Sequence, residues 1–177
     1  EVVEKSTGTG ALELLVDPLA LADLAPLAPI FADPAVVKIF HAADNDLAYL
    51  KRLYGFSVVS LFDTSLAARF LGLTALGLDE MLRAHLGVDP GKSRQKDDWS
   101  RRPLRAEQET YALNDVLHLI PLSAQLRDEL RALGRDARVV VERDRRGEDR
   151  VAAPLGPDED GERPLVAAGE RLGLERR

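Results

Sequence analysis

Apolar residues come in short runs along the first third of the chain, each bounded by turn-forming residues. The run 11–17 (ALELLVD) and the β-branched run 36–41 (VVKIFH) predict strands, the second of them buried and parallel. A shorter extended piece is expected at 58–62. Two prolines between 19 and 30 limit that segment to a helix or short turns.

Helical spacing of apolar positions follows two of these strands. One helix is expected with Asp44 as its N-cap and Gly55 as its C-terminal stop. A second begins at Asp63 or Thr64, with Asp63 acting as a cap rather than as a ligand, and ends at Gly72. Because strands alternate with helices, the pattern predicts an α/β fold.

The segment that follows is helical apart from one polar stretch. A helix is expected at 78–86, before Gly87, and the longest helix covers 105–133. Pro121 should kink or split that helix. Between the two helices lies a polar, basic loop at 91–103.

Residues 137–177 have a different character. Charges of both signs, glycine and proline dominate 142–163, and no aromatic residue follows Tyr111. We predict one domain, 1–136, followed by a charged, disordered tail at 137–177.

Charge and composition exclude several classes of protein. The formal net charge of −6 argues against a uniformly basic surface, so any contact with nucleic acid should be local. The chain has no cysteine, which excludes disulfides and fits a reducing compartment, so a cytoplasmic location is expected. No apolar run approaches the roughly 18 residues of a membrane span, so no membrane partner is expected.

Three residues are candidates for chemistry. Tyr111 and Asp115 stand four apart on the longest predicted helix, so they share one face. Asp46 follows the strand 36–41, at the edge where open α/β sheets bind ligands. Each residue also fits an ordinary role, as a tyrosine at the core edge, a solvated acid, or an acid favoured by a helix dipole.

Four segments in a fixed order resemble the ribonuclease D family of 3′–5′ exonucleases. HAADNDLAYLKRLYG at 41–55 is similar to that family's second motif and YALNDVLHLIPL at 111–122 to its third. Between them, FDTSLAARFLGL at 62–73 and GKSRQKDDWSRRPL at 91–104 resemble the family's intervening helix and basic loop. The resemblance implies an RNase H-like mixed sheet flanked by helices.

The resemblance also implies a site that holds two divalent ions, Mg²⁺ or Mn²⁺. Carried over, Asp46 and Asp115 are catalytic metal ligands, and Tyr111 orients the attacking water. Hard cations prefer oxygen ligands, and two of them can activate a water and stabilise the leaving 3′-oxygen. The implied partner is the 3′ end of single-stranded RNA or DNA, and the implied reaction is hydrolysis of RNA, such as a tRNA precursor, from that end.

The basic loop carries the expected substrate contacts. By resemblance these are Lys92, Gln95 and Arg102, which suit phosphate groups. Trp99 is expected to lie in the core with its N–H satisfied locally, and base stacking is the alternative. His41 stands at a strand end near the site. It is a candidate substrate contact, although its position favours a structural histidine.

One motif of the family is absent. An Asp-x-Glu pair is expected on the first strand of the sheet, and no such pair precedes His41. We therefore expect an N-terminally truncated domain that lacks its first strand or strands, with weakened metal binding, reduced or no activity, and a sheet edge that needs a cover. The alternative function is a catalytically silent nucleic-acid-binding protein or scaffold. The motifs leave the oligomeric state open.

Overall fold

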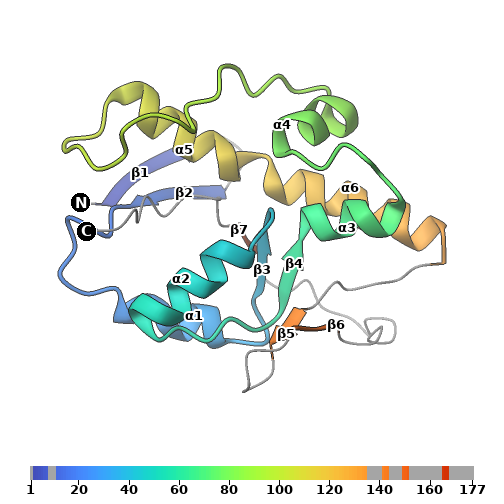
Figure 1. Cartoon of the computed structure of the whole chain (residues 1–177), viewed down its shortest axis with the longest axis horizontal. Coiled ribbons are helices and arrows are strands. Elements are labelled where there is room, and N and C mark those ends of the chain that lie inside the picture. The colour runs from blue at the N-terminus through green and yellow to red at the C-terminus, as the bar shows by residue number, and fades with distance from the viewer. Residues whose placement is uncertain (1, 8–10, 135–140, 144–148, 152–164, 168–177) are drawn as a thin grey trace.

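The computed structural model describes residues 2–7, 11–134, 141–143, 149–151 and 165–167. Its strands are β1 (Val2–Thr7), β2 (Ala11–Val16), β3 (Val37–Phe40), β4 (Leu61–Asp63), β5 (Val141–Arg143), β6 (Asp149–Val151) and β7 (Leu165–Ala167). Its longer helices are α2 (Asp44–Tyr54), α3 (Thr64–Leu71), α5 (Ala106–Leu117) and α6 (Leu119–Ala132). Shorter helical pieces are η1 (Ala25–Leu27), α1 (Ala28–Ala32), α4 (Leu78–Met81) and the π-helical turn Leu82–Leu86. The strands predicted at 11–17 and 36–41 and the predicted helices are thus present (Figure 1), whereas the extended piece expected at 58–62 forms a strand only from Leu61, as β4.

A small parallel sheet forms the centre. β3 pairs in parallel with β4, which places Phe40 opposite Asp63 at the carboxyl ends of both strands. The other edge of β3 pairs in parallel with β7, where Val37 lies opposite Leu165. β3 therefore has a paired strand of the same chain on each side. The described strands form three separate sheets, since β1–β2 and β5–β6 are antiparallel pairs of their own.

β3 is buried on both faces, and its one charged residue, Lys38, is buried with its ammonium group donating to the carbonyls of Asp33 and Val36. Successive residues of a strand point to opposite faces, so Ile39 and Phe40 enter different parts of the core. Ile39 packs in a cluster with Phe62 and the α6 leucines Leu119, Leu122, Leu126 and Leu130. Phe40 packs with Leu47 and Leu50 of α2 and with Phe56. The strand is thus held between α2 on one side and α6 on the other.

Local signals set most helix ends. Gly55 and Gly72 adopt the left-handed conformation at the ends of α2 and α3, as predicted. Asp63 caps α3, also as predicted. The predicted N-cap at Asp44 is wrong: Asp44 is the first helical residue of α2, and Ala43 stands at the cap without a side-chain hydrogen bond. The backbone before α2 is instead held from a neighbouring strand, as described below.

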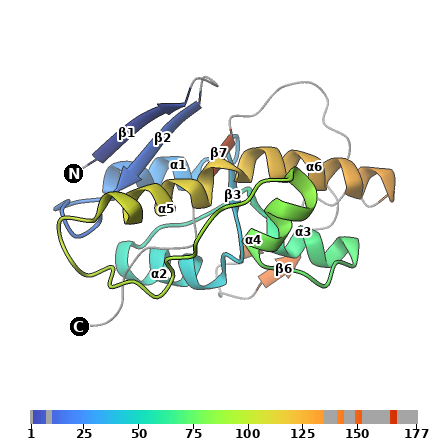
Figure 2. The ribbon, with the colours of Figure 1, turned by 90° about the horizontal axis from the view of Figure 1, so that it is seen from above.

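The predicted long helix is split in two. α5 ends at Leu117 and α6 begins at Leu119, two residues before Pro121, which lacks the N–H that a continuous helix needs. The two halves have different neighbours, since α5 contacts β2 whereas α6 contacts α3 and β3. Figure 2 shows α5 and α6 end to end, passing over β3. Among the described residues no helix is long and apolar enough to cross a membrane.

The predicted disorder of 137–177 falls mostly outside the described residues. Within that range the structure describes only β5, β6 and β7. For the remaining residues of the range, disorder stays a prediction.

Candidate active site

Asp46 lies in the first turn of α2, just beyond the carboxyl end of β3. Asp46 is only 6% exposed. The N-terminus of a helix favours an acid because the helix dipole presents positive charge there. In Figures 1 and 2 the junction of α5 and α6 lies beside this same end of β3. The structure therefore gathers the second-motif acid and the helix of the third motif at one edge of the sheet.

Tyr111 and Asp115 lie one turn apart on α5, as their spacing predicts. Tyr111 is buried, and its ring packs against Trp99, with 6.2 Å between the ring centroids. Asp115 is half-buried. A tyrosine fixed by packing keeps its hydroxyl in a defined place, which suits a group that must orient a water molecule.

Asp63 holds the backbone on which Asp46 depends. Its carboxylate accepts hydrogen bonds from the N–H groups of Ser65 and Leu66, which cap α3, at 2.8 and 3.1 Å. The same carboxylate accepts from Ala42 and Ala43, just before α2, at 3.1 and 2.8 Å. Ala42 has a φ of 54°, a left-handed conformation that costs a non-glycine residue about 1 kcal/mol. One buried carboxylate therefore stabilises both the cap of α3 and a strained turn before α2.

His41 is part of the core. His41 is 3% exposed, and its Nδ1 lies 2.9 Å from the hydroxyl oxygen of Thr64. That hydroxyl donates to the carbonyl of Phe40 at 3.1 Å, so the ring donates from Nδ1 to the hydroxyl. Burial lowers the pKa of His41, and the carboxylate of Asp63 opposes this shift. The geometry matches the structural reading of His41, and its contact with substrate stays a prediction.

The basic loop is anchored to α5 by Gln108, a residue that the sequence did not single out. Gln108 is 2% exposed, and its side chain donates to the carbonyl of Asp98 at 3.2 Å. Its amide oxygen accepts from the backbone N–H of Arg105 at 3.1 Å, one half of a capping box at the start of α5. The Trp99 indole donates to the carbonyl of Arg94 at 3.2 Å, which confirms that its N–H is satisfied locally, but Trp99 is half-buried rather than part of the core.

Arg102 has a partner that its position in a basic loop did not predict. Its guanidinium forms a two-pronged ion pair with Asp17, and the Nη2 to Oδ1 distance is 2.6 Å. This hydrogen bond lowers the pKa of Asp17 and raises that of Arg102. Arg102 also donates to the carbonyls of Trp99 and Arg101. Arg102 therefore ties the loop to the end of β2. These contacts do not support the predicted role of Arg102 in binding substrate.

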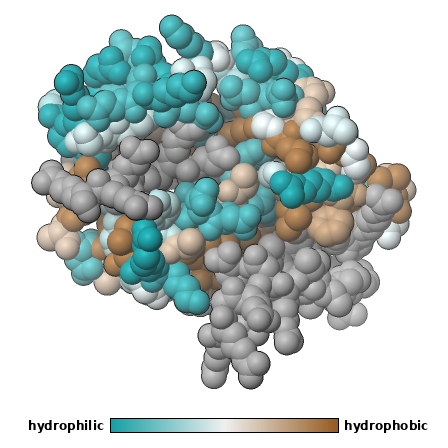
Figure 3. Space-filling model, viewed as in Figure 1, coloured by the Kyte–Doolittle hydropathy of each residue, from teal (hydrophilic) through white to brown (hydrophobic). Residues whose placement is uncertain are grey.

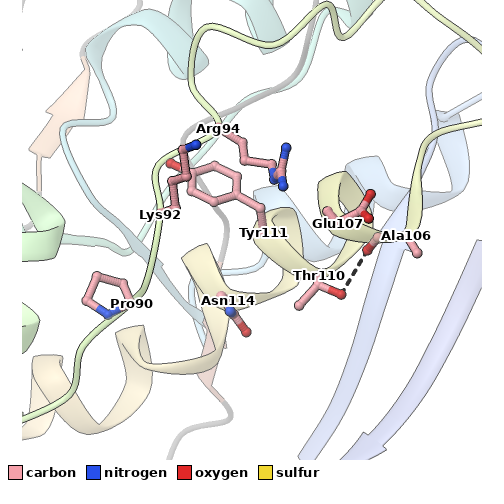
Figure 4. Close-up of a pocket in the computed structure, with 8 residues that line it drawn as sticks. All are labelled: Pro90, Lys92, Arg94, Ala106, Glu107, Thr110, Tyr111 and Asn114. Atoms are coloured by element: carbon pink, nitrogen blue, oxygen red, sulfur yellow. Dashed lines mark hydrogen bonds between the residues drawn. The ribbon is translucent and has the colours of Figure 1, made fainter.

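The loop and α5 enclose an open pocket of about 340 Å³ beside Tyr111 (Figure 4). Lys92 and Arg94 extend from the loop side, and polar residues extend from α5. The lining residues are Pro90, Lys92, Arg94, Ala106, Glu107, Thr110, Tyr111 and Asn114. Lys92 is exposed at the rim, as expected of a substrate contact, whereas Gln95 is exposed but does not line the pocket. Figure 3 shows hydrophilic residues gathered over this part of the molecule.

The donor set suits hard cations but is incomplete. Carboxylates are the ligands that Mg²⁺ and Mn²⁺ prefer, and Asp46 and Asp115 supply two of them. Within the described ranges no group of three or more histidine, aspartate or glutamate side chains is arranged to hold a metal ion. One buried acceptor in that part of the chain lacks a hydrogen-bond partner, Oε1 of Glu13 on β2, the strand that contacts α5.

The family model for 3′–5′ exonucleases matches residues 1–131, and the chain belongs to this family. The predicted family is thus confirmed, and with it the class of fold that surrounds the site.

Proteins with similar sequences and structures include ribonucleases. Ribonuclease D of Pseudomonas paraeruginosa is 42% identical over 130 residues, which are 71% of this chain and 35% of that protein. The structure of Escherichia coli ribonuclease D matches with a TM-score of 0.64 and 34% identity, and the match covers 70% of this chain and 35% of that one. Brucella melitensis NrnC bound to pGG matches with a TM-score of 0.65 and 31% identity, over 76% of this chain and 66% of that one. Another structure of NrnC holds Mg²⁺. The chain therefore spans about a third of the length of its ribonuclease D relatives.

Proposed function

We propose that this chain is the main part of an RNase H-like catalytic domain that removes nucleotides from the 3′ end of single-stranded RNA, in the manner of tRNA-precursor processing. The observation that carries the proposal is the placement of Asp46 after β3 together with Tyr111 and Asp115 on one face of α5. Ribonuclease D relatives and the pGG-bound NrnC structure support it.

The residues have separate roles in this proposal. Asp46 and Asp115 would hold two divalent ions, Mg²⁺ or Mn²⁺, which polarise a water and the phosphodiester when bound. The Mg²⁺-containing structure of NrnC supports that choice of ion. Tyr111, fixed against Trp99, donates its hydroxyl hydrogen bond to the attacking water. Lys92 and Gln95, both exposed on the loop, contact the phosphates of the strand.

A second function has its own support. Within the described ranges no group of three or more histidine, aspartate or glutamate side chains is arranged to hold a metal ion, which is compatible with a catalytically silent nucleic-acid-binding domain or scaffold. Metal-dependent hydrolysis separates the two functions.

The test uses 5′-labelled single-stranded RNA with Mn²⁺ or with EDTA. The chain is compared with a version that carries an added N-terminal Asp-x-Glu strand, and with the Asp115→Asn variant of that version. We expect the extended version to shorten RNA from the 3′ end only with Mn²⁺, and Asp115→Asn to abolish this. If neither version cuts RNA but both bind it, the scaffold function is correct.

A further inference from the structure

The pocket beside Tyr111 has two chemically different walls. On the loop side, Lys92 makes no salt bridge to any described residue, and its charge is open to solvent. Arg94 and Arg105 both form salt bridges with Asp97, and the Arg94 salt bridge is the longer, at 3.3 Å against 2.6 Å. A guanidinium carries five N–H donors, so one such contact leaves Arg94 with donors for a phosphate.

On the opposite wall two groups accept hydrogen bonds from a ligand, Glu107 and Thr110, and the Asn114 amide can both accept and donate. Glu107, Thr110 and Asn114 follow one another at helical spacing and share a face of α5. The Thr110 hydroxyl donates to the carbonyl of Ala106 at 2.8 Å, so its oxygen can only accept from a ligand (Figure 4). Glu107 is exposed and forms no salt bridge to a described residue. Its carboxylate accepts hydrogen bonds and donates none.

Size and floor restrict the ligand further. A volume of about 340 Å³ is at the lower end of the roughly 300–1,000 Å³ typical of small-molecule sites, which suits one nucleotide. The floor is the Tyr111 ring, backed by Trp99, an aromatic surface on which a base or sugar can pack.

We propose that this pocket holds one nucleotide of the substrate strand, with its phosphate on Lys92 and Arg94 and its base edge on the α5 wall, and that it prefers bases with an amino group at the position of adenine N6 or cytosine N4. The proposal rests on the proposed function, since it assigns the pocket to the same strand. Adenine and cytosine present an amino donor where guanine and uracil present a carbonyl. A carbonyl facing Glu107 and Thr110 brings acceptor against acceptor, whereas an amino group forms a hydrogen bond.

The test is binding of nucleoside 5′-monophosphates to the full chain, in the absence of divalent metal. AMP is compared with IMP and CMP with UMP, because each pair differs at this edge by an amino group against a carbonyl. Trp99 is the only tryptophan of the chain, so its indole N–H signal in NMR reports on the pocket floor, and the Asn114 side-chain amide reports on the wall. We expect AMP to bind several-fold more tightly than IMP, and CMP more tightly than UMP.

Two variants with matched controls assign the walls. Glu107→Gln adds a donor to the wall and should reduce the AMP-to-IMP ratio, whereas Glu109→Gln, outside the pocket on the same helix, should leave it unchanged. Lys92→Gln should weaken all four nucleotides alike, and Lys96→Gln on the same loop should not.

Equal binding of AMP and IMP, or a ratio unaffected by Glu107→Gln, overturns the base preference. Binding of all four that is unaffected by Lys92→Gln overturns the subsite itself. The RNA degradation test decides the proposed function separately, because an extended chain that shortens RNA without these preferences retains the function and loses only the subsite.

Discussion

The carboxylate of Asp63 accepts a hydrogen bond of 2.8 Å from the backbone N–H of Ala43, twenty residues earlier in the chain. The bond joins the carboxyl end of β4 to the turn that starts α2, the helix of Asp46. Asp63→Asn should place an amide N–H against the N–H of Ala43 and cost about 1–3 kcal/mol of unfolding free energy, measured in urea. Mn²⁺ affinity should fall as well, because the start of α2 is no longer held.

The matched control for this variant is Asp23→Asn. Asp23 also accepts a backbone N–H bond, from Ala25 at 2.8 Å, but on the exposed surface. Its effect should stay within about 0.5 kcal/mol. Similar losses for both variants would show that Asp63 acts only as a local turn residue.

Acid should destabilise the chain through His41. The unfolded-state pKa of histidine is about 6.5, and burial lowers the folded value, against the opposing charges of Asp63 and Asp79. The unfolded chain therefore binds more protons as pH falls below about 6.5, and the unfolding free energy decreases. His41→Gln should flatten the pH dependence of the urea midpoint between about pH 7 and 5. An unchanged pH dependence in His41→Gln would assign the effect to other groups.

The ion pair of Asp17 and Arg102 should stabilise the chain by about 1 kcal/mol, which is at the upper end for partly exposed pairs. The measurement is the coupling energy in a double-mutant cycle of Asp17→Asn and Arg102→Gln. Because the pKa of Asp17 is lowered, this contribution is present above the unfolded value of about 3.9 and is lost as pH falls through the folded one. Arg101→Gln is the control, since its side chain is 83% exposed. A coupling near zero at neutral pH would mean that the pair is solvated in solution.

Glu13→Leu should stabilise the chain by about 1 kcal/mol or more in chemical denaturation, because it removes a buried carboxylate oxygen that lacks a hydrogen-bond partner. The neighbouring Leu14 is 46% exposed, so Leu14→Glu on the same strand should be close to neutral. A loss of stability in Glu13→Leu would reveal a partner for Glu13 beyond the described residues.

Local patterns predicted most elements correctly, because their causes lie within a few residues. The β-branched run at 36–41 became β3, and Gly55 and Gly72 end helices because they tolerate the left-handed conformation. Pro121 correctly predicted a divided helix for a similar reason, because its missing N–H removes a hydrogen bond from the helical turn that contains it.

What the sequence could not predict depends on contacts between distant segments. Asp44 looked like a cap, yet the turn before α2 takes its acceptor from Asp63. Arg102 looked like a phosphate ligand, yet Asp17, 85 residues away, neutralises it. Gln108 gave no signal beyond its place three residues after Arg105, because its importance comes from burial. The sequence thus predicted the position of Asp46 after β3 and of Tyr111 and Asp115 on one helix, but it did not predict the contacts around them.

The break between α5 and α6 separates Tyr111 and Asp115 from the apolar face of α6. Tyr111 and Asp115 stand at the same three-and-four spacing as Leu119 and Leu122, so in one straight helix all four would form a single stripe. The leucines of that stripe are fully buried, and an uninterrupted helix would carry the aspartate toward the same apolar seam. Because the repeat is divided near Pro121, α5 packs beside β2 while α6 packs on α3 and β3, and Asp115 stays partly exposed although Leu119 and Leu122 are fully buried.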